Sequence, residues 1–150
     1  QLACLYHRSQ GMFSQLMELE TLQELREIFK GGTSVYWLTH YVFGQPSPSH
    51  PKTLSQSSID LLIINTVVPF LYAYGKHKGE ERLCNRASQL LEDLKPENNY
   101  ITRMWEECGL KAAHAGDSQA LIQLKKNYCD SKKCLYCRIG YEYFKKEQKE

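Results

Sequence analysis

The sequence predicts an all-α fold, an irregular bundle of about seven to eight helices around a central apolar helix at residues 57–74. Two observations lead to this prediction. Apolar residues recur at three- and four-residue spacing in one segment after another, which is the pattern of helices with one buried face. Glycine, proline, serine and asparagine separate these segments at the places where helices usually begin and end. The hydrophobic fraction of 42% and the charged fraction of 24% are those of a globular protein.

Three short helices are predicted before residue 30. Apolar residues at positions 2, 5 and 6 indicate the first, the second covers residues 12–19, and the third covers residues 21–29. The third has the clearest beginning, because Thr21 and Glu24 fit a capping box in which each side chain accepts a hydrogen bond from the other residue's backbone N–H.

The middle of the chain contains an aromatic segment, a loop and the central helix. Residues 34–43 fit either a short helix or an extended segment, and three prolines make residues 44–55 a surface loop. The central helix has apolar residues on several faces, so we expect it to be buried. Ser57 is its expected N-cap, Gly75 its expected end and Pro69 an expected kink. Its apolar stretch is too short to cross about 30 Å of hydrocarbon comfortably.

Four further helices follow. They are expected at residues 79–94, from Asn98 or Asn99 to Cys108, at residues 117–128, and from about Cys134 into a charged tail. Cys108 shares an apolar stripe with Trp105 in the second of these.

Length and composition favour one helical domain, residues 1–150, as the C-terminal part of a longer protein. The chain begins at Gln1 without a visible secretory signal, which favours a cytoplasmic location. The net charge of +2 gives no strong field toward nucleic acid or a membrane. In such a compartment the six cysteines are expected to be reduced or bound to metal.

The main functional candidate is the C-x4-C-x2-C pattern of Cys129, Cys134 and Cys137. The short spacing can bring three sulfurs together at a junction between two helices, as zinc and iron–sulfur sites require. A fourth ligand is needed, and Cys108 is the first candidate. Spacing does not decide between zinc and an iron–sulfur cluster.

Two other interpretations remain open. The cysteines can be reduced core residues of a plain interaction or scaffold domain, because free cysteine is often buried. Cys134 and Cys137 can instead form a thiol redox module, because a helix N-terminus and nearby lysines stabilise a thiolate.

Basic residues suggest two anion or nucleic-acid contacts. Lys76 and Lys78 lie in a glycine-flanked turn, where backbone N–H groups could hold a phosphate at a helix start. Lys132, Lys133 and Arg138 adjoin aromatic residues near the C-terminus. No nucleophile–base or metalloprotease motif occurs, so we expect no catalysis in this chain and identify no small-molecule substrate.

Two segments resemble a bacterial family called domain of unknown function 2851. They are residues 57–69 and residues 117–125, the latter followed by Cys129, Cys134, Cys137, Arg138, Ile139 and Gly140. The resemblance implies that this chain is the C-terminal region of such a protein, with the upstream domain as a partner. That upstream region is similar to a PD-(D/E)xK nuclease core, and some nucleases of that kind carry iron–sulfur clusters. The resemblance includes the three clustered cysteines and leaves the fourth ligand open.

Overall fold

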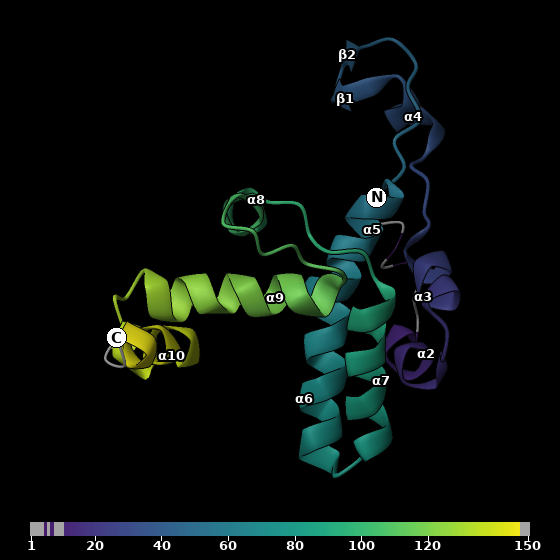
Figure 1. Ribbon diagram of the computed structural model, residues 1–150. Helices are drawn as coiled ribbons and strands as arrows, with labels where there is room; N and C mark the ends of the chain where they lie inside the picture. The colour runs from purple at the N-terminus through teal and green to yellow at the C-terminus, as the bar shows by residue number, and fades with distance from the viewer. Residues whose placement is uncertain (1–4, 6, 8–10, 148–150) are drawn as a thin grey trace. The chain divides into compact units, whose positions relative to one another are not determined.

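The computed structural model describes Leu5, His7 and residues 11–147 (Figure 1). The first predicted helix therefore falls, except for Leu5, outside the described residues. The predicted all-α fold is confirmed, with one small two-stranded hairpin in addition. The chain divides into two compact units, Gln1–Leu90 and Leu91–Glu150, and each is described by itself. That the two fold as one domain stays a prediction.

The first unit begins with α2 (Met12–Glu18) and α3 (Leu22–Phe29), close to their predicted bounds. The predicted capping box is present: Thr21 Oγ1 accepts from the Glu24 N–H at 3.2 Å, and Glu24 Oε2 accepts from the Thr21 N–H at 2.9 Å. Helix α3 is joined to α5 (Gln56–Leu62) by Arg26, which donates to both carboxylate oxygens of Asp60 at 2.7 and 2.9 Å. This ion pair fixes two helices that are distant in sequence.

The aromatic segment forms both of the alternatives that the sequence left open. Residues Val35–Leu38 form the short helix α4, and His40–Val42 form strand β1, which pairs antiparallel with β2 (Gln45–Pro46). Gly44, at φ 72°, makes the tight turn between the strands. Its N–H donates to the hydroxyl of Tyr36 at 2.9 Å, so the hairpin is tied back to α4.

The central helix is longer and less regular than predicted. It begins at Gln56 with Ser55 as its N-cap rather than Ser57, and it ends at Gly79 rather than Gly75. A π-helical turn, η1 (Ile63–Val67), separates α5 from α6 (Val68–Lys78). Pro69 is the second residue after this turn. Because proline has no N–H and its ring clashes with the carbonyl four residues earlier, a widened turn relieves the conflict.

The central helix is buried on one face, and its other faces carry exposed apolar side chains. One stripe is buried, and it consists of Ile59, Ile63, Ile64, Val67, Val68, Leu71 and Gly75. Leu61, Phe70 and Tyr72 are exposed on other faces. The continuous run Gln56–Lys78 has 23 residues and a hydropathy of 1.4, so length and composition alone would let it cross a membrane. The core helix of a soluble protein can have the same length and hydropathy. The most apolar 18-residue window of this helix is 39% buried.

Helices α6 and α7 (Glu81–Asp93) lie side by side as a hairpin (Figure 1). A Cβ added to Gly75 would lie 2.9 Å from Cys84 Sγ and 3.0 Å from Leu83 Cβ, so the missing side chain permits the close approach. On α7 the side chains of Leu83, Ala87 and Leu90 are buried.

The second unit contains α8 (Tyr100–Glu107), α9 (Ala115–Leu124) and α10 (Arg138–Glu147). Asn99 caps α8, one of the two residues proposed. Helix α9 begins two residues earlier than predicted and continues as a π turn, η2 (Lys125–Cys129). Cys134 does not begin the last helix. It lies in a separate 3-10 turn, η3 (Cys134–Tyr136).

This second unit has a thin core. Among its described residues the buried hydrophobic ones are Leu94, Ala115 and Cys137. Ala120 of α9 is exposed. A unit of this size with so few buried side chains gains little from the hydrophobic effect, so other interactions must contribute to its stability.

Candidate metal centre

Cys129 is the last residue of η2, and the loop after it reverses the chain. The N–H groups of Lys132 and Lys133 donate to the carbonyls of Cys129 and Tyr128 at 3.0 and 2.8 Å. Lys132 has a φ of 52°, which non-glycine residues rarely adopt. The loop is therefore held in a tight conformation that returns Cys134 to the end of η2.

Cys134 and Cys137 are joined by the 3-10 turn. The Cys137 N–H donates to the Cys134 carbonyl at 3.2 Å, and the Cys137 carbonyl accepts from the Tyr141 N–H of α10 at 2.8 Å. Cys137 is therefore the residue directly before α10, and its side chain is buried.

Gly140 allows η3 to lie directly against α10. A Cβ added there would be 3.0 Å from the carbonyl carbon of Cys134 and closer still to its oxygen. These are backbone atoms, so they cannot turn aside as a flexible side chain could. The position of Cys134 thus depends on the absence of a side chain at residue 140.

The three clustered cysteines line one cavity of about 180 Å³, and its surface is almost wholly apolar. The other lining residues are Trp105, Leu124, Tyr128, Ile139 and Gly140. The indole N–H of Trp105 donates to the carbonyl of Leu121 at 3.1 Å. Because Leu121 does not line the cavity, this bond directs the N–H away from it. Cys129, Cys134 and Cys137 thus line the same cavity, and their binding of a metal stays a prediction.

The thiol of Cys129 is electrostatically coupled to the other two. Although the residue as a whole is exposed, partial burial of the thiol is the largest cause that raises its pKa, and the neighbouring Cys137 raises it further. Lys125 acts in the opposite direction. A raised pKa keeps the Cys129 thiol protonated at neutral pH. The redox interpretation rests on Cys134 and Cys137, and it stays a prediction.

Within the described part of the chain, no three His, Cys, Asp or Glu side chains are arranged so as to hold a metal ion. Tetrahedral zinc requires four ligand atoms, with sulfurs at about 2.3 Å from the ion. The three thiols line one cavity without adopting that arrangement.

Cys108 does not line the cavity. It follows α8 as its C-cap and is exposed, contrary to the alternative that it packs into an apolar stripe. It lies three residues after Trp105, which does line the cavity. The structure therefore brings three of the four predicted ligands together and places the fourth near the end of a helix that contributes to the cavity wall.

The basic residues are distributed over both units. Lys76 and Lys78 belong to the last turn of α6, so the turn lies at a helix C-terminus, where carbonyls rather than N–H groups are unpaired. Their ammonium groups lie over the rings of Tyr72 and Tyr74, at 5.6 and 6.0 Å from the ring centroids. Helix α7 begins at Glu81, directly after this turn, and an anion contact by Lys76 and Lys78 stays a prediction.

The C-terminal basic residues flank the cysteines. Lys132 and Lys133 are exposed in the loop, and Arg138 in the first turn of α10 pairs with Glu142 at 3.1 Å. An anion contact by these three residues stays a prediction.

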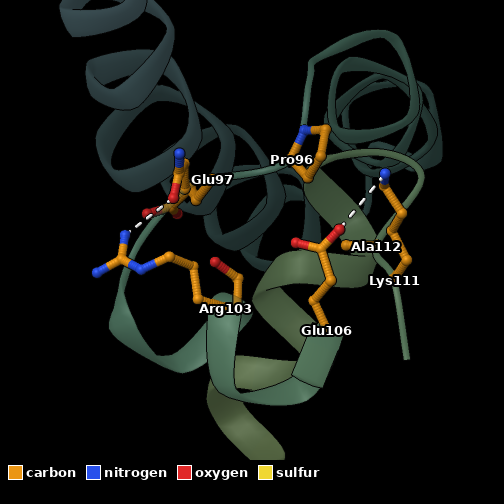
Figure 2. Close-up of a pocket in the computed structure, with 8 residues that line it drawn as sticks. Pro96, Glu97, Arg103, Glu106, Lys111 and Ala112 are labelled. Carbon is orange, nitrogen blue, oxygen red and sulfur yellow. Dashed lines mark hydrogen bonds and ion pairs between the residues drawn. The ribbon is translucent and has the colours of Figure 1, made fainter. Parts of the chain in front are cut away.

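A second hollow, of about 300 Å³, lies beside the start of α8 (Figure 2). Figure 2 shows its charged side chains engaged with neighbours: Arg103 donates to Asn98 at 3.0 Å, and Lys111 pairs with Glu106 at 3.4 Å. Glu97 accepts a hydrogen bond from Gln119. Because local partners engage these charges, the hollow indicates no particular ligand.

Sequence reasoning missed the apolar wall of the cysteine cavity. Trp105 and Leu124 reach it from α8 and α9, and their arrival depends on how those two helices pack. Gly140 did carry a signal, since a glycine inside an otherwise regular helix often marks a close backbone approach.

A family model described as "Protein of unknown function (DUF2851)" matches residues 1–100. The match ends before Cys129, so it does not include the cysteine cluster. No curated protein and no solved structure matches the chain.

Proposed function

Since this chain belongs to the DUF2851 family of proteins of unknown function, we propose from its own geometry that residues 91–150 form a structural metal-binding module. The ligands are the thiolates of Cys129, Cys134 and Cys137. The observation that carries the proposal is that these three thiols line a single apolar cavity at the junction of η2, η3 and α10. A metal centre there would join the end of one helix to the beginning of the next.

The thin core of the unit supports a stabilising role for the metal. Helix α10 has ten residues, and isolated helices of that length are marginal in water. Ile139, Tyr143 and Phe144 of this helix are exposed by 55%, 61% and 43%. Packing therefore stabilises α10 weakly, and a covalent anchor at Cys137 would offset the entropy lost when the helix orders.

Cys108 is the fourth ligand of this proposal. It follows the last turn of α8, three residues after Trp105. Because it is exposed and ends a helix, a local adjustment of the turn at Gly109 can bring its sulfur toward the cavity.

Elemental analysis of protein purified without oxygen tests the proposal. We expect stoichiometric zinc or iron in the wild-type chain and loss of metal in Cys137→Ser, with a melting temperature lower by more than about 4 °C. Cys84→Ser is the matched control, because Cys84 lies in the other unit and its Sγ donates to the Tyr72 carbonyl at 3.7 Å, a bond that serine can replace. Wild-type protein that contains neither metal would refute the proposal.

A plain interaction domain is the second candidate, favoured by the exposed apolar residues of α10. It requires no metal. It therefore predicts that Cys134→Ser leaves the melting temperature unchanged, whereas the metal-binding proposal predicts a decrease.

A further inference from the structure

We infer that the group held by Cys129, Cys134 and Cys137 is a polynuclear iron–sulfur cluster rather than a single zinc ion. This inference rests on the proposed function, since it specifies what the same three thiols bind. Two observations carry it: the size of the cavity that the three cysteines share, and the apolar character of its lining.

The cavity is too large for one ion. Zinc is surrounded directly by its four ligand atoms at about 2.0–2.3 Å, so a zinc site leaves no hollow between its ligands. The cavity here measures about 180 Å³. An apolar cavity of about 150 Å³ takes up a molecule the size of benzene. The space therefore suits a compact group of several atoms.

The wall of the cavity is suited to an inorganic core. Trp105, Leu124 and Ile139 contribute apolar surface, and the one indole N–H is already bonded elsewhere. Low polarity and limited access of solvent are among the factors by which proteins set the properties of such clusters.

Three cysteines suit a cluster of four irons and four sulfides. Three of the irons each bind one thiolate of Cys129, Cys134 or Cys137. The fourth iron binds Cys108, which is the fourth ligand of the proposed function. On binding, each thiol loses its proton to solvent as its sulfur bonds to iron, and the cluster keeps its oxidation state.

The test is the composition of the full chain purified without oxygen from cells grown with ample iron. We expect about four irons and about four acid-labile sulfides per chain, with a broad visible absorption that bleaches when dithionite is added. The variants Cys129→Ser, Cys134→Ser and Cys137→Ser should each lose most of the iron, while Cys84→Ser should keep it.

The outcomes separate the two proposals. One zinc per chain without sulfide would overturn the cluster and leave the metal-binding module intact. Protein without zinc, iron or sulfide would overturn both. Because the wild-type composition decides, the result does not depend on whether a serine variant folds.

Discussion

Gly140→Ala gives a sharp test of the cavity, because two physical effects predict opposite signs. Alanine is favoured over glycine inside a helix by about 1 kcal/mol, so propensity alone predicts a more stable protein. The structure predicts a less stable one. The new Cβ would lie 3.0 and 3.2 Å from the carbonyl carbon and Cα of Cys134, whereas carbons prefer about 3.5–4.0 Å.

Relief of this contact requires η3 and α10 to separate by about half an ångström or more. Overpacking of this kind costs about 1–3 kcal/mol, and the clash is with backbone, which cannot rotate away. After the gain in propensity, we expect a net loss of about 1 kcal/mol in the free energy of unfolding. Cys134 should also move away from the other thiols, which predicts a lower metal content.

Urea denaturation of both proteins, followed by circular dichroism, measures the change. Gly32→Ala is the control, since a Cβ added there would meet no atom within 4 Å. We expect a change within about 0.5 kcal/mol there. A Gly140→Ala protein that is about 1 kcal/mol more stable than wild type would show that η3 does not lie against α10, and the cavity geometry would fail with it.

Three further predictions concern interactions elsewhere in the chain. Asp60→Asn removes the charge that faces Arg26, whose side chain is 19% exposed, and should reduce stability by about 1–2 kcal/mol in urea denaturation; a change below about 0.5 kcal/mol would assign the pair no role. Hydrogen bonds from Thr21 lower the pKa of Glu24 below its unfolded value near 4.5. The ionised carboxylate therefore stabilises the fold above pH 4.5, and this contribution is lost as the pH falls through the lower pKa of the folded state. Glu24→Gln keeps the capping box and should flatten the acid side of the stability profile; an unchanged profile would exclude this group as its cause. Lys132 has a φ of 52°, which glycine adopts without strain and alanine does not. Lys132→Gly should therefore be more stable than Lys132→Ala by about 1 kcal/mol, and equal stabilities would mean that the loop is not strained.

Features encoded within a few residues could be predicted from the sequence. The capping box of α3 depends on Thr21 and Glu24 alone, and both roles are confirmed. The beginning of the central helix was missed by two residues because Ser55 and Ser57 are both suitable caps. Ser55 takes the role because its Oγ accepts from the Ser58 N–H at 3.2 Å.

Features that depend on packing could not be predicted. The central helix is apolar on several faces, and periodicity does not say which of them meets a partner. Ile63 and Leu71 are buried, whereas Leu61 and Phe70 are exposed. The same limit applied to the site. Spacing brought Cys129, Cys134 and Cys137 to one cavity, but the contribution of Trp105 follows from the packing of α8 on α9.

The candidate site lies outside the residues that the family model matches. The three clustered cysteines and Gly140 fall within residues 129–140, and the helices that complete the wall, α8 and α9, belong to the same unit. Closing loops this short costs little entropy, so the site needs few long-range contacts to form. The family match covers residues 1–100 and ends before it. Membership of the family, as the match shows it, therefore does not by itself predict the proposed metal-binding module.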